Sequence, residues 1–126
     1  MKVHSCTPII PSKDLSCSLK FWIDGLGFKI TNSMGPDNAM KWCLLEGDGM
    51  QVMLNIRDGD PEKPEDCEGI RMYWNPNDLE QLHAHLKAIG FNVSELWDRD
   101  YGMREFFVDD LDGFNHCFGV PIQEET

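Results

Sequence analysis

The sequence contains the same plan twice, with an offset of 64 residues, the distance from Asp14 to Asp78. Two matches have this offset: Asp14-Leu15 with Asp78-Leu79, and Gly49 with Gly113. A third match, Leu26-Gly27-Phe28 with Ile89-Gly90-Phe91, has an offset that is one residue shorter. An internal repeat indicates two copies of one supersecondary unit that pack against each other. We therefore predict two copies of one module, with the ligand-binding place between them.

Composition bounds the class of protein. At 126 residues with 41% hydrophobic content, the chain fits one globular domain with a core of its own. No apolar run reaches the length of a membrane span, and the start lacks the apolar stretch of a signal peptide. We therefore expect a cytoplasmic protein. Its cysteines are odd in number, widely spaced and without a CxxC pair, which favours reduced thiols: Cys6, Cys17, Cys43, Cys67 and Cys117.

The charge is strongly acidic, with 22 Asp and Glu against 11 Lys and Arg and a net charge of −11. Nucleic acid is disfavoured as a partner because phosphate binding requires clustered Lys and Arg. The acidic residues form either a solvated surface that maintains solubility or a cleft that attracts cationic ligands. Charge alone does not choose between these two readings.

Hydrophobic periodicity predicts strand, helix and three strands in each half. In the first half we expect strands at 3–10, 28–34, 39–46 and Met50–Ile56. Ser12 or Asp14 can cap a helix that begins at Leu15 and ends at Gly27. In the second half we expect strands at 70–74, 93–97, 104–109 and 115–120, and a helix that follows an N-cap at Asp78 and ends at Gly90.

These elements form two βαβββ modules, an α+β fold with a curled mixed sheet around a cavity. We predict a single domain of residues 1–126, with module 1 at about 1–57, a polar linker at about 58–68 and module 2 at about 69–122.

Three stretches resemble the glyoxalase/bleomycin-resistance/extradiol-dioxygenase superfamily, also called vicinal oxygen chelate proteins. They are Thr7 to Leu15, Phe21-Trp22 through Phe28, and Tyr101 to Asp109 running into Asp112-Gly113-Phe114-Asn115. The first is similar to the opening of the bleomycin-resistance branch. One departure is visible: the family's Asp-Pro-Asp-Gly turn is replaced by Asp109-Asp110-Leu111-Asp112-Gly113, which has an extra residue and no proline.

The resemblance implies four positions at which metal-dependent members place His, Gln or Glu ligands. Here those positions hold Thr7, Met53, Arg71 and Cys117. Arg71 is a permanent cation that repels a divalent ion, and Thr7 and Met53 are poor ligands for a hard metal. One thiolate does not make a site, so we predict neither a metal nor another cofactor.

The assignment of residues to these metal positions could be one residue out of register, which leaves a metal-binding alternative open. The altered turn could place His116 in the last-strand position, and a second slip would place Cys6 in the first-strand position. The protein would then be a metal-dependent glyoxalase-like lyase or isomerase, or a transferase of the kind that acts on fosfomycin.

Aromatic residues are the better candidates for ligand contact. Strand alternation places Tyr73 on the face of Arg71, while the resemblance implies that Phe106 faces the cavity. The repeat offset then places Trp42 in the matching position, and Trp97 lies where the family has the groove rim. The predicted ligand-binding set is Trp42, Arg71, Tyr73, Trp97, Phe106 and Cys117, although each ring could instead be core packing.

The resemblance and the missing ligands together predict a metal-free binding protein rather than an enzyme. It would sequester a cationic or aromatic small molecule, with an antibiotic as one candidate, in an aromatic and acidic groove. The resemblance also implies a homodimer. We expect no nucleic-acid or membrane partner, and a sensor domain that controls a partner protein ranks last.

Overall fold

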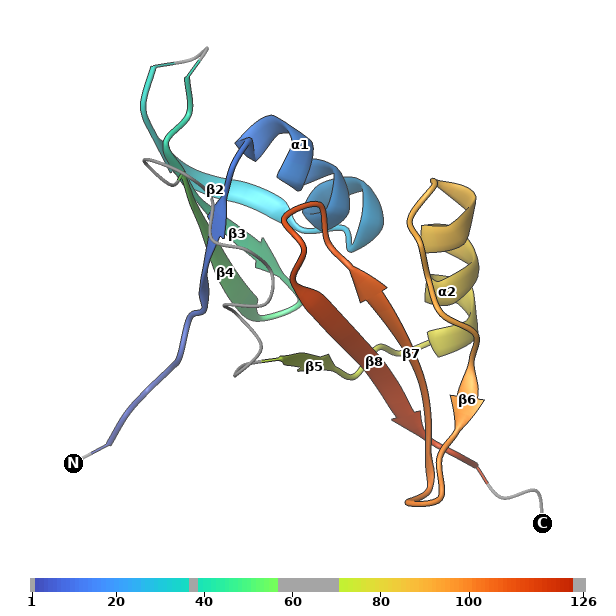
Figure 1. Cartoon of the computed structure of the whole chain (residues 1–126). Helices are drawn as coiled ribbons and strands as arrows, with labels where there is room; N and C mark the ends of the chain where they lie inside the picture. Colours follow the sequence, from blue (N-terminus) through green and yellow to red (C-terminus); the bar gives the residue numbers. More distant parts are fainter. Residues whose placement is uncertain (1, 37–38, 57–70, 124–126) are drawn as a thin grey trace. The chain divides into compact units, whose positions relative to one another are not determined.

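The computed structural model describes residues 2–36, 39–56 and 71–123. The chain divides into two compact units, Met1–Pro61 and Glu62–Thr126, and each is described by itself. Figure 1 shows that each unit contains one sheet and one helical segment. The predicted linker at 58–68 lies outside the described residues, and the single-domain arrangement stays a prediction.

The first unit is a four-stranded sheet with the strand order β1-β4-β3-β2. β1 pairs in parallel with β4, and the other neighbouring strands are antiparallel. The elements are β1 (Ile9–Ser12), α1 (Leu15–Leu19), a π-helix η1 (Lys20–Gly25), β2 (Lys29–Met34), β3 (Trp42–Gly47) and β4 (Met50–Ile56). Leu45 and Leu54 are buried on the face toward α1, together with Phe21 and Trp22 from the helical segment.

The second unit repeats this topology with the strand order β5-β8-β7-β6. Its elements are β5 (Met72–Trp74), α2 (Leu79–Ala88), β6 (Trp97–Asp98), β7 (Met103–Asp109) and β8 (Asn115–Pro121). The predicted α+β fold with two βαβββ modules is confirmed, while the curling of the sheets around a common cavity stays a prediction.

The largest differences from the sequence prediction are at two strands. The first strand is shorter than the predicted 3–10 and starts at Ile9. The predicted strand at 93–97 is β6 at Trp97–Asp98, preceded by a single bridge between Val93 and Val108. By contrast, the predicted helix starts are confirmed, because the side chain of Asp14 accepts a hydrogen bond from the backbone of Cys17, and that of Asp78 accepts one from Gln81.

The π-helix explains why part of the repeat is out of step. At its end the backbone N–H of Leu26 donates to the oxygen of Phe21, five residues back, and Phe28 donates to Trp22. In the second unit the backbone N–H of Phe91 donates to the oxygen of Leu86. This spacing is one residue shorter than the spacing from Phe28 to Trp22. A π-turn accommodates one extra residue within a helix. The first helical segment therefore contains one residue more than the second.

The turn between β7 and β8 contains one extra residue, which restores the offset of 64 between the two units. The buried Asp110 organises this turn. One carboxylate oxygen accepts from the backbone N–H groups of Asp112 (2.9 Å) and Phe114 (3.0 Å). The backbone N–H of Asp110 donates to Phe114. Because proline has no N–H to donate, the family's proline would lose this last bond.

The other carboxylate oxygen of Asp110 contacts the core of the second unit. It lies 2.9 Å from Nε2 of His116, whose Nδ1 accepts a hydrogen bond from the indole N–H of Trp74 at 3.0 Å. An indole nitrogen only donates, so Nε2 is the histidine nitrogen that carries the hydrogen for Asp110. Asp110, His116 and Trp74 thus form a buried chain of hydrogen bonds that connects the turn to β8 and β5.

Substitution of Asp110 tests this organisation. Asp110→Ala removes three acceptor contacts and leaves the N–H of His116 buried without its partner, so we expect a loss of about 3 kcal/mol in the free energy of unfolding. The matched control is Asp109→Ala, which removes one exposed contact from Asn115 and should cost less than about 1 kcal/mol. Urea denaturation measures both, and equal losses would contradict the assigned role of Asp110.

Candidate functional site

The sheet of the second unit has one face toward α2 and one face away from it, which we call the open face. Cross-strand neighbours share a face, so the register assigns each side chain. Tyr73 pairs with Cys117, Cys117 with Phe107, and Glu105 with both Gly119 and Trp97. All six residues therefore belong to the open face.

Phe106 was predicted to face the cavity, and this placement was wrong. Its side chain is 0% exposed and lies on the α2 face, where its ring is 5.0 Å from that of His83 and stacks on Phe118 at 5.2 Å. Because of the extra residue in the β7–β8 turn, the offset between equivalent residues of β3 and β7 is one residue shorter than the offset between those of β4 and β8. Phe107 consequently occupies the open-face position that had been assigned to Phe106.

Glu105 is the centre of the open face. Its carboxylate accepts hydrogen bonds from the hydroxyls of Tyr73 (2.7 Å) and Tyr101 (2.6 Å), and Nε of Arg99 lies 3.9 Å away. The Glu105 side chain is only 3% exposed, because the two tyrosines lie over it. Desolvation of the hydroxyl and then the bond to Glu105 raise the pKa of Tyr73, and the bond to Glu105 also raises the pKa of Tyr101.

Gly119 makes the close approach of Tyr73 to Glu105 possible. A Cβ atom at position 119 would overlap the Tyr73 hydroxyl and would lie 3.0 Å from Cγ of Glu105. Both neighbours belong to the same hydrogen bond, so a side chain here would separate its donor from its acceptor. The absence of a side chain is therefore a packing requirement of this network.

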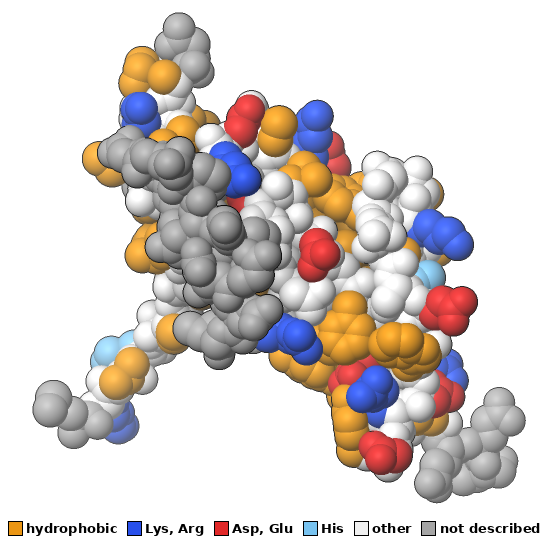
Figure 2. All heavy atoms as spheres, in the orientation of Figure 1, with side chains coloured by type: hydrophobic (Ala, Val, Ile, Leu, Met, Phe, Trp, Pro, Cys, Tyr) orange, Lys and Arg blue, Asp and Glu red, His pale blue; other side chains and the backbone are white. Residues whose placement is uncertain are grey.

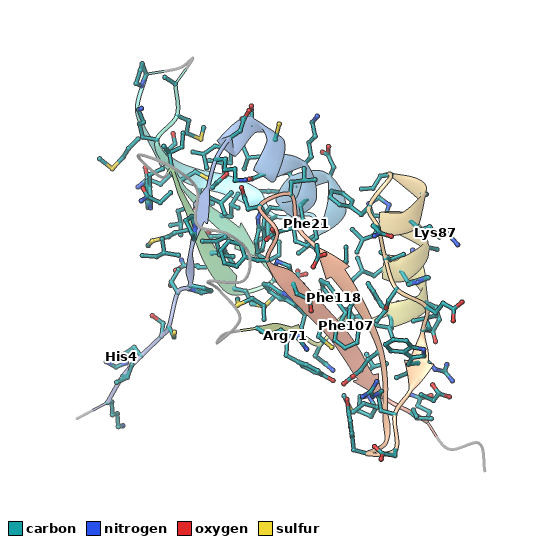
Figure 3. The ribbon with its side chains drawn as sticks, in the orientation of Figure 1. His4, Phe21, Arg71, Lys87, Phe107 and Phe118 are labelled. Atoms are coloured by element: carbon teal, nitrogen blue, oxygen red, sulfur yellow. The ribbon has the colours of Figure 1, made fainter. Side chains whose placement is uncertain are left out.

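Two arginines lie over the aromatic rings of the open face. The guanidinium carbon of Arg71 is 5.4 Å from the ring centre of Phe107, and that of Arg99 is 5.8 Å from Trp97 and 5.7 Å from Tyr101. These distances are in the range of cation–π contacts. Figure 3 shows Arg71 and Phe107 side by side at this sheet. Neither Arg99 nor Phe107 was predicted.

Cys117 faces the open face, and His116 faces α2 as part of the chain with Trp74 and Asp110. The register slip that would have brought His116 to the metal position is therefore wrong. Burial and then the nearby charge of Glu105 raise the pKa of Cys117 to about 11. Its thiol is largely protonated near neutral pH, which weakens it as a nucleophile and as a metal ligand.

The first unit contributes a more apolar sheet face. Trp42 is half-buried and pairs with Met34 and Asn55, while Met53 pairs with Ile9. These side chains lie on the face away from the buried residues of the α1 side. Trp42 is thus on the predicted side of its sheet, and its contact with a ligand stays a prediction.

The donor atoms at the four family metal positions do not suit a divalent ion. In the first unit, the Thr7 hydroxyl donates to Gln51 and Met53 offers a thioether. In the second unit, Arg71 is cationic and the Cys117 thiol has a raised pKa. Across residues 2–36, 39–56 and 71–123, no three His, Cys, Asp or Glu side chains are grouped so that they could hold a metal.

A separate cavity of about 660 Å³ lies at the start of α2. It is lined by Asn75, Asp78, Glu80, Arg104 and neighbouring residues that include Val120. Arg104 is already engaged there by Asp98 at 2.6 Å and Glu80 at 2.9 Å. None of the predicted site residues lines this cavity.

Gly119→Ala tests the packing under Tyr73. We expect a loss of about 2 kcal/mol in the free energy of unfolding, because the added methyl group overpacks a filled site. In the Tyr73→Ala background the same substitution should cost less than half as much, since the clashing hydroxyl is gone. Urea denaturation of the double-mutant cycle measures this coupling, and additive losses would show that Gly119 and Tyr73 do not interact.

Residues 2–118 match the model of the Glyoxalase/Bleomycin resistance protein/Dioxygenase superfamily, and no curated protein matches significantly. No helix in the described part of the chain is long and apolar enough to cross a membrane.

Three solved structures share the fold at low sequence identity. TioX from Micromonospora sp. ML1 is 19% identical, with a TM-score of 0.71 and coverage of 98% of this chain and 100% of TioX. TnmS3, an antibiotic binding protein from Streptomyces sp. CB03234, is 18% identical, with a TM-score of 0.73 and coverage of 96% and 98%. A bleomycin resistance determinant encoded on the transposon Tn5 is 16% identical, with a TM-score of 0.73 and coverage of 96% and 100%. With the family model matched over residues 2–118, the chain belongs to the glyoxalase/bleomycin resistance protein/dioxygenase superfamily.

Proposed function

We propose that the protein binds and sequesters a small molecule with a flat aromatic surface, without a metal and without transforming it. The observation that carries this proposal is the group of aromatic rings on the open face of the second unit. Tyr73, Trp97 and Tyr101 are 52%, 46% and 58% exposed, and Phe107 contacts both Trp97 and Arg71. Figure 2 shows hydrophobic side chains gathered over β6, β7 and β8, with basic side chains beside them.

Exposed rings that are held in fixed orientations favour stacking. Hydrogen bonds to Glu105 hold Tyr73 and Tyr101, and Trp97 contacts the Phe107 ring edge-on at 6.0 Å. Aromatic pairs contribute about 0.5–1.5 kcal/mol beyond the area that they bury. A planar ligand that covers several rings would therefore gain affinity from each of them.

The polar groups on this face favour binding over catalysis. Both oxygens of the Glu105 carboxylate accept phenolic hydrogens, so this group is poorly placed to take a proton from a ligand. The Cys117 thiol, with its pKa raised to about 11, is a weak nucleophile near neutral pH.

The solved relatives support an antibiotic as the ligand class. TnmS3 is described as an antibiotic binding protein, and the Tn5 protein as a bleomycin resistance determinant. In the first unit, Trp42 is the aromatic side chain that we propose to contact the ligand.

The homodimer that the family resemblance implies is part of the proposal. Sedimentation equilibrium of the full chain should give a mass of twice 14.5 kDa. A single species at the monomer mass over micromolar concentrations would contradict the proposed dimer. It would not contradict ligand binding, which a separate experiment tests.

Trp97→Ala tests the aromatic face. We expect the wild-type protein to bind 1-pyrenemethanol, a neutral planar probe, and the variant to bind it about fivefold to tenfold more weakly because one stacking ring is lost. The anisotropy of pyrene fluorescence measures both affinities. The control is Ile89→Ala, which removes an exposed apolar side chain at the end of α2 and should change nothing. Equal affinity in wild type and Trp97→Ala would contradict the proposed site.

A further inference from the structure

Arg71 and Arg99 lie over the rings of the open face, while the exposed acid Asp109 belongs to the same face at the end of β7. The Arg99 side chain is 39% exposed and Arg71 is exposed, whereas the Glu105 side chain between the two tyrosines is 3% exposed. The two tyrosine hydroxyls also occupy the oxygens of Glu105. The nearby acids Asp98 and Glu80 bind Arg104, whose side chain is on the α2 face. The charges that lie directly over the aromatic rings are therefore cationic, within an acidic protein.

We infer that the ligand is an aromatic acid, a planar ring system with a carboxylate or similar anionic group, bound on the open face with the anion at Arg99 and Arg71. This inference rests on the proposed function and names its ligand class. It replaces the wider expectation of a cationic or aromatic ligand, because the arginines already lie over the rings that would attract a cation.

The geometry of the arginines suits an anion beside a ring. Each guanidinium lies over an aromatic ring and belongs to an exposed residue, so an anion at the aromatic surface can reach its N–H groups. A guanidinium can donate two parallel hydrogen bonds to a carboxylate. A ligand that stacks on Trp97 would thus bring an attached acid within reach of Arg99. A cationic ligand would instead have to displace Arg99 and would meet two like charges.

The net charge of −11 does not reverse this preference. Charges separated by more than about 8 Å are largely screened at physiological salt, so distant carboxylates mainly slow the approach of an anion. The short-range contacts with Arg99 and Arg71 decide how long the ligand stays bound.

Three probes with one ring system and different head groups test the inference on the full chain. They are 1-pyrenecarboxylate, 1-pyrenemethanol and 1-pyrenemethylammonium, and fluorescence anisotropy gives their affinities. We expect the carboxylate to bind at least about tenfold more tightly than the ammonium, with the alcohol between them. If the three bind equally, or the ammonium binds best, the inference is overturned while the proposed function stands. If none binds, the proposed function fails.

Arginine variants locate the anion. Arg99→Gln and Arg71→Gln should each lower carboxylate affinity about fivefold to tenfold and leave the alcohol nearly unchanged, while Arg99→Lys should keep part of the preference because it keeps the charge. Arg104→Gln is the control on the opposite face of the same sheet, and circular dichroism checks the folding of every variant. Loss of carboxylate binding in Arg104→Gln alone would place the probe in the cavity at α2 and overturn the assignment.

Discussion

The buried hydrogen-bond chain from Asp110 through His116 to Trp74 is the constraint on which the second unit depends. Asp110 also accepts the two backbone N–H groups that shape the turn between β7 and β8. The turn sets the pairing of these strands, and a shift of one residue would move every side chain to the other face. The same interaction thus stabilises the core and determines that Glu105 and Phe107, rather than Phe106, lie on the open face.

The repeat shows how two copies of one module diverge without losing their topology. The first unit has one residue more in its helical segment, where a π-turn accommodates it, and the second has one residue more in its hairpin turn, where Asp110 organises it. Strand pairing on either side of these points is equivalent in the two units: Ile9 pairs with Met53 as Tyr73 pairs with Cys117. The equivalent open-face positions hold isoleucine and methionine in one unit, and tyrosine and cysteine in the other.

Much of the fold could be predicted from the sequence because local signals agree with the tertiary structure. The caps at Asp14 and Asp78 rest on short-range patterns that the structure confirms, whereas the choice between Cys117 and His116 was left open by the sequence. The error at Phe106 arose because its position was taken from the family resemblance by counting back from Asp109, in a turn that departs from the family pattern. Arg99 was not found because it lies in the turn after β6, where no periodicity marks the direction of a side chain.

The hydrogen bonds of Tyr73 and Tyr101 to Glu105 have a consequence for the thermodynamics of association. Side chains that become ordered only when a guest arrives oppose binding by losing rotamer freedom. Here the carboxylate and the two phenols restrict each other in the empty protein, and Gly119 leaves the room that this arrangement needs. The entropy of those groups is lost during folding, so a guest would meet a surface that is already rigid.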